Sequence, residues 1–518
     1  MFFGILVAIL SAVLVVYVYF KVFLYTYWDN FNVETIEPTF PFGSIFKIFT
    51  GHFSLSGCVR EFYEKCNGKF AGIYFVTSPA IFIKDPELVK LILVKDFNSF
   101  TDTGLYLDEK KEPTSGHLFR LKGERWRTIR NKLTPAFTVG KLKGMFTTIT
   151  DVADQLKIHL SEECDGQNID VSDLTTRYSA DIIASTIFGL ENNSFKDKNN
   201  DFILMAKDLF VSESFLRICK GALQVFFPTI LSYFHPETVK NAQDKFIYHM
   251  VKNVIEYREK NKVTRADLMQ LLMQLKNKGK ISDEDKENDL SVFDEKTNNE
   301  VTLSLNEIAA QAYTFFFAGY ETTSTTLSLL LYECAINQHL QKNIQKNIDE
   351  VLDKYNGAIT YESVSEMEYL DRAISETLRK YPPLSFLARV ATKDYVIPDT
   401  KVTIKKDMRV LICVDGLQND PKYFPVPNKF DPDRFLPSEV SKRPQFSYLP
   451  FSEGPRTCIG KRIGKIKIAV GMAMMLRNFN FDICKNTEFP IKFNKMSFLI
   501  QAQKPIVLNI TKRVEEKE

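Results

Sequence analysis

The chain has 518 residues, of which 45% are apolar and 25% charged, and this ordinary composition excludes disordered, collagen-like and coiled-coil proteins. Lys and Arg number 67 and Asp and Glu 64, so the net charge of +3 gives no argument for a nucleic-acid partner, and none is expected. Eight cysteines in 518 residues are too few for a disulfide scaffold and fit a reducing compartment, and the lack of any Cys-x-x-Cys pair argues against structural zinc. The length corresponds to about two to four average domains or to one large enzyme.

The first segment is apolar enough to cross a membrane. Residues 1–20 contain no charged side chain, and as a helix they would span about 30 Å, the thickness of a hydrocarbon core. The alternative, a cleaved secretion signal, would begin with basic residues and end in small ones, and this run does neither. We therefore predict that residues 1–28 form an uncleaved anchor with an interfacial aromatic belt of Tyr17, Tyr19, Tyr25, Tyr27 and Trp28.

The remainder shows no linker that would divide it into separate domains. We predict a hinge at 29–50, one large and mostly α-helical domain with small β-sheets at 51–512, and a charged tail at 513–518. The longest predicted helix, 303–336, is free of Pro and begins with a Ser304–Glu307 capping box. Other expected elements are a β-hairpin at 70–84, short strands at 395–397, 402–404 and 410–412, and a basic helix at 459–476.

The most informative stretch runs from Phe451 to Gly460. Cys458 stands there between a Gly-Pro turn and a predicted helix, whose N-terminal N–H groups favour a thiolate, as does the cation of Arg456. Gly454 and Gly460 allow a flat, bulky group to approach the backbone. Such a thiolate could attack a substrate, bind a metal or ligate a haem iron; a buried structural cysteine is the alternative interpretation.

This stretch resembles the cysteine signature of the cytochrome P-450 haem-thiolate monooxygenases. All five fixed positions of their Phe-x-x-Gly-x-Arg-x-Cys-x-Gly pattern are present, and the resemblance extends from about residue 38 to 510. It implies a single cytochrome P-450 fold that holds haem b (iron protoporphyrin IX), with the Cys458 thiolate as the axial ligand of the iron. It also implies that Phe451, Arg456 and Gly460 bind the haem.

Further motifs of the same family occur along the chain. Glu376-Thr377-Leu378-Arg379 matches its Glu-x-x-Arg motif and Pro432-Asp433-Arg434-Phe435 its Pro-x-Arg-Phe motif. The resemblance implies a buried charge network of Glu376, Arg379 and Arg434 that supports the cysteine loop. Other matched positions are expected to hold the haem propionates; they are Trp126 and Arg130 of a Trp-x-x-x-Arg motif, Arg389 and Arg456.

The long helix carries Ala318-Gly319-Tyr320-Glu321-Thr322-Thr323, which matches the family's Ala/Gly-Gly-x-Asp/Glu-Thr-Thr. Threonine hydroxyls can bond back to carbonyls and open the helix locally, and an acid beside an alcohol suits proton delivery. We predict that Glu321 and Thr322 are catalytic and that Ala318 contacts the haem. Helical spacing places Phe315 on the face of Ala318 and Thr322. A plain buried helix is the alternative.

The family resemblance implies a monooxygenase that inserts one oxygen atom of O2 into a lipophilic small molecule. The chain has no Gly-x-Gly-x-x-Gly fingerprint, so a partner must bind the nucleotide. The resemblance implies that this partner is NADPH–cytochrome P-450 reductase, with cytochrome b5 as a candidate second donor. Segments 37–43 and 132–143 resemble the microsomal, toxin-metabolising branch of insects, which implies the endoplasmic reticulum membrane and a cytoplasmic catalytic domain. In that branch, a His usually stands at the position of Gln418.

Two surfaces are expected to serve this reaction. The reductase should dock on basic residues near the cysteine: Lys461, Arg462, Lys465, Lys467, Arg127, Lys132, Lys141 and Lys143. The substrate pocket should be lined from the loop 101–121, the region 205–250, Phe315, Phe316, residues 384–387 and residues 496–499.

Four alternatives remain open at this point. The same chemistry could act on an endogenous hormone precursor or fatty acid. Some relatives rearrange peroxides without a reductase, but they typically lack the acid–alcohol pair that Glu321 and Thr322 supply. The chain could also be a membrane-anchored haem carrier or sensor. A cysteine hydrolase would need a His base, and none of the six His residues has a recognisable partner motif.

Overall fold

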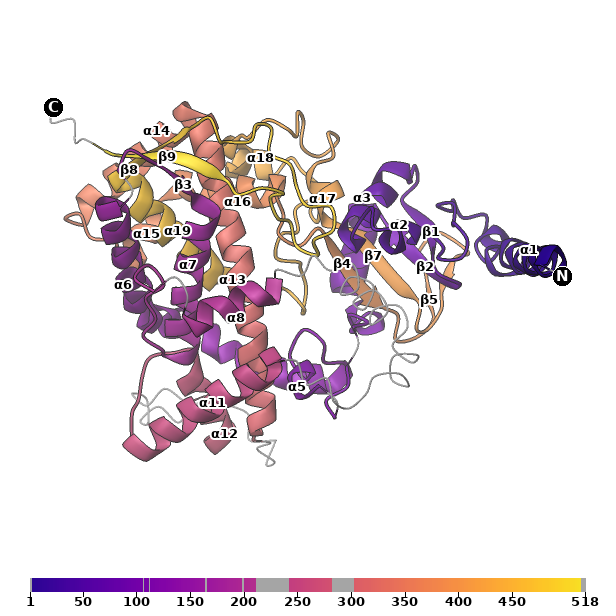
Figure 1. Cartoon of the computed structure of the whole chain (residues 1–518), viewed down its shortest axis with the longest axis horizontal. Coiled ribbons are helices and arrows are strands. Elements are labelled where there is room, and N and C mark those ends of the chain that lie inside the picture. Colours follow the sequence, from indigo (N-terminus) through magenta and orange to yellow (C-terminus); the bar gives the residue numbers. More distant parts are fainter. Residues whose placement is uncertain are drawn as a thin grey trace.

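The structure is a computed structural model that describes residues 2–105, 107–110, 112–163, 165–197, 200–210, 242–281 and 302–513. It consists of a large helical body on one side and a smaller sheet-rich part on the other, as Figure 1 shows. The expected fold class, mostly α-helical with small sheets, is confirmed. Most of the predicted pocket region 205–250, and residues 514–518 of the predicted tail, lie outside the described residues.

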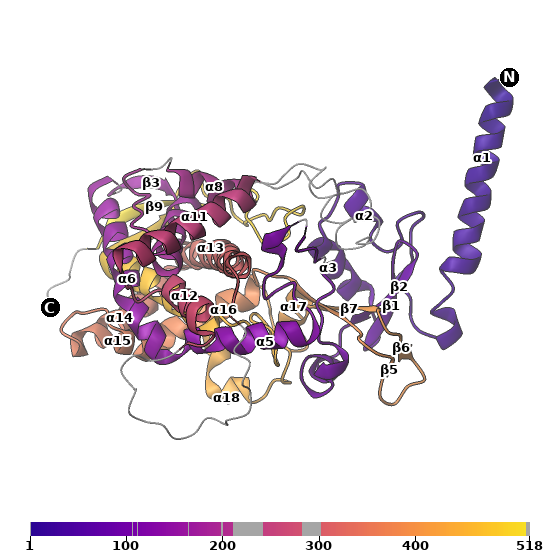
Figure 2. The same cartoon turned by 90° about the horizontal axis from the view of Figure 1, so that it is seen from below.

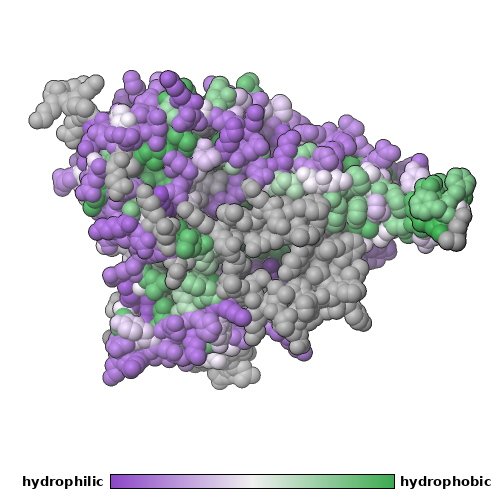
Figure 3. Space-filling model, viewed as in Figure 1, coloured by the Kyte–Doolittle hydropathy of each residue, from purple (hydrophilic) through white to green (hydrophobic). Residues whose placement is uncertain are grey.

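The N-terminal helix α1 (Phe2–Tyr19) stands away from the body and is exposed along its length (Figure 2). Together with the following turns it forms a 30-residue segment, Phe2–Phe31, in which an 18-residue window reaches a mean hydropathy of 2.6, so it is long and apolar enough to cross a membrane. This segment forms the hydrophobic projection at one end of Figure 3. Trp28 was wrongly assigned to the aromatic belt, because its side chain is fully buried and donates its indole N–H to the Ile73 carbonyl at 3.3 Å.

The segment predicted as a hinge packs against the first strand of the sheet. The Ile36 N–H donates to the Gly72 carbonyl at 2.9 Å, and the Glu34 carboxylate accepts the Gly68 N–H at 2.9 Å. Ile45 is buried just before the short helix α2 (Phe46–Phe49). These contacts tie the chain that follows α1 to the sheet-rich part.

The largest sheet has four strands in the order β1-β2-β7-β4. β1 (Phe70–Phe75) and β2 (Ser78–Ile83) form the predicted hairpin, and β2 pairs in parallel with β7 (Arg409–Cys413). β4 (Phe386–Val390) closes the sheet at the edge nearest the helical body (Figure 1). The smaller sheets are β3 (Gln167–Asp170), β9 (Val507–Lys512) and β8 (Phe479–Ile483) in that order, and β5 (Tyr395–Val396) with β6 (Thr403–Ile404).

The long helix α13 (Leu305–Ile336) crosses the helical body (Figure 1), and Ser304 and Glu307 form the predicted capping box at its start. Helices α7 (Val171–Ile183) and α19 (Lys461–Asn478) pack against it. The remaining described α-helices are α3 (Leu55–Lys65), α4 (Pro86–Lys90), α5 (Gly123–Leu133), α6 (Val139–Glu163), α8 (Asp201–Phe210), α11 (Ala242–Asn261), α12 (Leu268–Lys278), α14 (Gln338–Lys354), α15 (Tyr361–Glu366), α16 (Glu368–Lys380), α17 (Val414–Gln418) and α18 (Pro437–Val440).

Candidate active site

The cysteine loop holds Cys458 directly before α19. The Cys458 N–H donates to the Phe451 carbonyl at 2.8 Å, and the Thr457 N–H donates to the Gly454 carbonyl at 2.9 Å. Gly454 has a φ of +77°, and a Cβ there would collide with the Leu93 carbonyl, so only glycine fits. A Cβ on Gly460 would lie 4.0 Å from the Cys458 sulfur. Because Gly454 and Gly460 carry no side chain, the loop leaves space beside the Cys458 sulfur.

The Cys458 side chain is exposed in the structure, although the surrounding protein partly desolvates its thiol. Burial raises the pKa of the Cys458 thiol, and the Gly460 N–H and the cations of Arg130, Lys461 and Lys467 only partly oppose this. The Gly460 N–H at the start of the helix favours a thiolate, as the sequence predicted, but without a metal ion desolvation outweighs it. Coordination to a metal ion deprotonates such a thiol outright.

One face of α13 remains open in the middle of an otherwise buried helix. Its members follow the spacing of three and four residues that places side chains on one helical face: Thr314, Phe317, Ala318, Glu321 and Thr322. The Thr322 hydroxyl donates back to the Ala318 carbonyl at 2.6 Å, as expected for a threonine that loosens a helix. Ala318 and both predicted catalytic residues thus lie on one open face.

The prediction that Phe315 and Phe316 line the pocket is wrong. Both are buried in the helical core, where the Phe315 ring lies 5.4 Å from Phe137 and the Phe316 ring 5.2 Å from Phe202. The open face carries Phe317 instead, whose ring stacks on Tyr313 at 6.4 Å. Helical spacing reaches Phe317 from Glu321 and Phe315 from Ala318, so spacing alone does not choose between them.

Glu321 has a partner that the sequence did not reveal. Its Oε1 accepts a hydrogen bond from the Gln501 amide at 2.8 Å, and Ser497 donates in turn to the Gln501 Oε1 at 3.0 Å. Burial raises the pKa of Glu321, and the hydrogen bonds from Gln501 and Thr325 oppose this rise. Glu321 is therefore hydrogen-bonded to the loop 497–501. This loop has no strand or helix pattern in the sequence, so the contact could not be predicted.

The guanidinium groups of the buried Arg389 and of the half-buried Arg130 and Arg456 lie close to one another, and none of the three forms an ion pair among the described residues. Within the same part of the chain, the Arg389 Nε has no hydrogen-bond acceptor. Burial lowers the pKa of Arg389 to about 10, and burial together with the Arg389 charge lowers that of Arg456 to about 9. Buried charges without a partner are costly, so this cluster is built for an anion.

Arg456 is held in place by the backbone and by an aromatic ring. Its guanidinium donates to the carbonyls of Thr101, Leu118 and Leu121, and it lies 4.2 Å from the centre of the buried Trp126 ring. The structure therefore brings Trp126 together with the cations that the motifs predicted. A flat group with two carboxylates and a metal that accepts a thiolate would satisfy the cation cluster, the open sulfur and the open face of α13, and haem is such a group.

The charge network beneath the cysteine loop is present as predicted. Glu376 and Arg379 are fully buried and joined by two hydrogen bonds of 2.7 and 2.9 Å, and the Arg434 Nε lies 3.4 Å from Glu376. The buried Gln418 replaces the usual His and links this network to the loop. Its amide donates to the Leu378 carbonyl at 2.9 Å, while its oxygen accepts the Leu449 N–H at 2.7 Å.

The predicted docking surface needs one correction. Lys467 is buried with 2% exposure, so it cannot belong to a docking surface. Lys461 and Arg462 are exposed beside the cysteine loop, as is Arg127 on α5. Several of the set already have partners: Arg127 pairs with Glu124 at 3.6 Å, Lys465 with Asp371 at 2.6 Å and Lys143 with Glu362 at 2.5 Å, and Lys132 donates to the Gly279 carbonyl at 2.6 Å.

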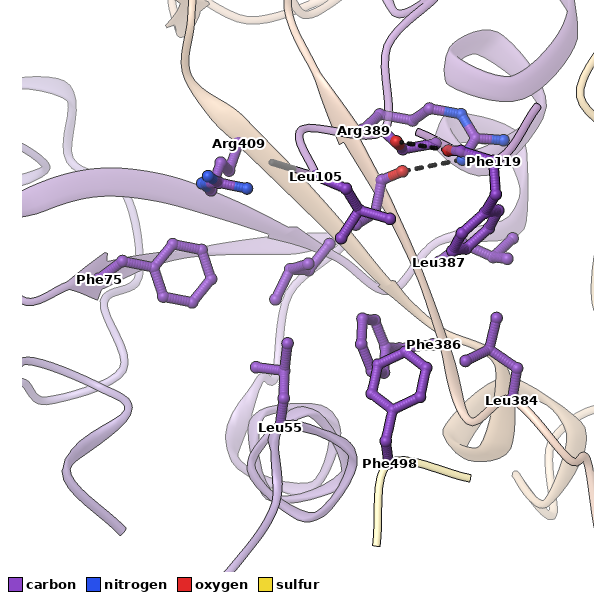
Figure 4. A pocket seen from close by; sticks show the side chains of 13 residues that line it. Leu55, Phe75, Leu105, Phe119, Leu384, Phe386, Leu387, Arg389, Arg409 and Phe498 are labelled. Carbon is purple, nitrogen blue, oxygen red and sulfur yellow. Dashed lines mark hydrogen bonds between the residues drawn. The ribbon is translucent and has the colours of Figure 1, made fainter. Parts of the chain in front are cut away.

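A largely apolar pocket opens between the four-stranded sheet and the C-terminal loops (Figure 4). It is lined by residues from three of the predicted segments: Thr103, Leu105, Phe119, Leu384, Phe386, Leu387 and Phe498. Two guanidinium groups, those of Arg389 and Arg409, also contribute to its wall. The pocket is thus lined both by predicted substrate segments and by Arg389 of the cation cluster.

Comparison with known proteins agrees with this site. The family model described as Cytochrome P450 matches residues 37–509, and the chain belongs to that family. It is 40% identical to Cytochrome P450 6d3 of Musca domestica over 96% of both chains. It is also 36% identical to Cytochrome P450 6k1 of Blattella germanica, over 98% of this chain and 97% of that protein. The protein is therefore a monooxygenase that carries haem b with the Cys458 thiolate as axial ligand, as the sequence predicted.

Proposed function

We propose that this monooxygenase oxidises lipophilic foreign compounds, using NADPH electrons delivered by NADPH–cytochrome P-450 reductase at the endoplasmic reticulum membrane. The observation that carries the proposal is the pairing of Glu321 and Thr322 on the open face of α13, since proton delivery is needed when oxygen is reduced with external electrons. The apolar, aromatic pocket supports a lipophilic substrate. The membrane-length helix α1 supports a membrane location, with the catalytic domain on the cytoplasmic side.

Each site residue receives a role from its position. Arg130, Arg389 and Arg456 neutralise the two propionates, and Trp126 supports Arg456 through its ring face. Phe451 and Gly460 lie on either side of Cys458 in the loop, where they would contact the haem. The small side chain of Ala318 would leave room for the haem beside α13. When bound, haem supplies oxygen activation, which the electron-rich thiolate promotes.

Proton movement falls to Glu321 and Thr322. Because burial raises the pKa of Glu321, this carboxyl can take up and release a proton closer to neutral pH than an exposed glutamate can. Gln501 fixes its orientation at 2.8 Å, and Thr322 holds its hydroxyl at the Ala318 carbonyl until the helix loosens.

The reductase docks on the side of the cysteine loop, where Lys461 and Arg462 are exposed. Cytochrome b5 is the candidate second donor at the same surface. Both partners are placed on this side because Cys458, which would hold the iron, lies in the loop directly before Lys461 and Arg462.

A second candidate function is the oxidation of an endogenous fatty acid or hormone precursor. It is favoured by Arg409, one of two arginines in the wall of the largely apolar pocket, whose guanidinium donates to the Gly104 carbonyl at 3.0 Å. A carboxylate at one end of a long apolar substrate would suit this guanidinium. Comparing turnover of a fatty acid with that of its methyl ester distinguishes the two functions.

The first test is a reduced carbon-monoxide difference spectrum of membranes that contain the chain, with Cys458→Ala beside it. We expect the strongly red-shifted Soret band of a thiolate-ligated ferrous haem, and its loss in the variant. Reductase and NADPH are then added with a set of lipophilic compounds. A normal band without any reductase-dependent product across foreign compounds and fatty acids would refute the proposed function.

A further inference from the structure

The loop 494–501 carries two side chains that serve different parts of the site. Phe498 lies in the wall of the apolar pocket, where its ring meets Phe386 edge to face with centroids 5.8 Å apart (Figure 4). Gln501, three residues later, does not line this pocket, and its amide donates to the Glu321 carboxylate at 2.8 Å. One short loop therefore contacts both the pocket and the acid of the acid–alcohol pair.

Hydrogen bonds within the loop connect these two side chains. The Asn494 N–H donates to the Gln501 carbonyl at 2.8 Å, and the Ser497 N–H donates to the Asn494 carbonyl at 3.3 Å. The Ser497 hydroxyl donates to the Gln501 Oε1 at 3.0 Å, which leaves the amide nitrogen of Gln501 directed at Glu321. Because Ser497 directly precedes Phe498, a displacement of the Phe498 ring also displaces the bond that orients Gln501.

The backbone of the loop is attached to its neighbours, whereas the Phe498 ring keeps exposed surface. The Ser56 hydroxyl of α3 donates to the Phe498 carbonyl at 2.9 Å, and the Ile500 N–H donates to the Pro383 carbonyl at 3.0 Å. Phe498 is nevertheless 43% exposed, so a lipophilic ligand in the pocket can bury more of the ring. Such a ligand stabilises the arrangement of the loop that gives it the larger apolar contact.

We propose that Ser497, Phe498 and Gln501 are positioning residues that couple occupancy of the pocket to the orientation of Glu321. A ligand that packs on Phe498 favours the arrangement in which the Gln501 amide holds the Glu321 carboxylate. The inference rests on the proposed function, because it makes proton delivery by Glu321 depend on bound substrate. Coupling between two sites is reciprocal, so the Gln501–Glu321 bond must strengthen ligand binding by the same factor.

The test measures this reciprocity on the full-length, haem-loaded protein without reductase. Two probes that ligate haem iron through an imidazole nitrogen are titrated by the shift of the Soret band. They are clotrimazole, which carries bulky aromatic rings, and imidazole itself, which has no apolar substituent. Gln501→Leu should weaken clotrimazole binding at least about fivefold and imidazole binding less than about twofold. In the Phe498→Ala background, the same substitution should change clotrimazole binding less than about twofold, because the ring that transmits the effect is absent.

Two controls separate coupling from general damage to the loop. Gln503→Leu removes an exposed amide directly after the loop and should leave both affinities within about twofold of the wild type. The exchange Glu321→Gln with Gln501→Glu keeps a hydrogen bond between the two side chains in the reverse direction. It should restore clotrimazole binding to within about twofold of the wild type, which damage to the loop would not allow.

The outcomes distinguish this inference from the proposed function. The inference is overturned if the effect of Gln501→Leu persists in Phe498→Ala, occurs equally with imidazole or with Gln503→Leu, or is not rescued by the exchange. Clotrimazole that binds no more tightly than imidazole also overturns it, since the apolar wall would then contribute nothing. Coupling of the expected size in a protein that forms no reductase-dependent product would refute the proposed function alone.

Discussion

Replacing Glu376 by alanine should strongly destabilise the protein, because it leaves a cation unpaired in the core. Glu376 accepts two hydrogen bonds from Arg379, at 2.7 and 2.9 Å, and the Asp431 N–H at 3.0 Å. Both side chains of the Glu376–Arg379 pair have no exposed surface. After the substitution, the Arg379 guanidinium keeps only neutral acceptors such as the carbonyls of Gln418 and Pro427, at 2.9 and 2.7 Å.

The magnitude follows from that geometry. Breaking a buried ion pair from one side costs about 3–5 kcal/mol. Since about 1.4 kcal/mol is a factor of ten, the ratio of folded to unfolded protein falls about 10²- to 10⁴-fold. A domain is stable by only about 5–15 kcal/mol, so haem retention at physiological temperature should be lost or nearly lost. Glu376→Gln keeps the side-chain volume but removes the charge, so most of the loss in the free energy of unfolding should also occur in this variant.

The assay is chemical denaturation followed by haem absorbance and by fluorescence of the two tryptophans, both of which are buried. Glu350→Ala serves as the control, because its 3.8 Å pair with Lys346 is exposed and should contribute at most about 0.5 kcal/mol. If Glu376→Ala binds haem and unfolds within about 1 kcal/mol of the wild type, the reasoning about this network is refuted.

Three further predictions concern the site. Gln501→Leu removes a hydrogen bond that favours the charged form of Glu321, so the pKa of Glu321 should rise and its titration in the pH–rate profile should move to higher pH; an unchanged profile would contradict the pairing. Arg389→Met should weaken haem retention at least about tenfold while leaving the apoprotein equally or more stable, measured by haem transfer and by denaturation of the apoprotein, and parallel losses would argue against an anion site. Burial lowers the pKa of His117 below its usual 6.5, so the unfolded chain binds this proton first and the free energy of unfolding should fall as pH drops below about 6.5, by up to about 1.4 kcal/mol per pH unit. His117→Gln should flatten this slope in denaturation curves between pH 5 and 7, and equal slopes would exclude His117 as its origin.

Short motifs with a local geometry could be predicted from the sequence. The Cys458 loop depends on a turn that only Gly454 can make, and the start of α13 depends on the reciprocal bonds of Ser304 and Glu307. The pair Glu376 and Arg379 lies three residues apart on one helix, so its contact is also local. In each case, residues close in sequence determine the geometry, so a single sequence is enough to predict it.

Burial and long-range partners were decided only by the tertiary structure. Helical spacing tells which residues share a face but not which neighbour the face meets, and this is why Phe317 rather than Phe315 lies on the open face of α13. Lys467 and Trp28 were expected at surfaces, yet packing of α7 and α13 covers the first and β1 covers the second. Gln501 meets Glu321 across 180 residues, a contact that no local pattern encodes. The chemistry of the cysteine was therefore fixed by sequence, whereas the electrostatic and proton-handling surroundings depend on how distant helices and loops pack together.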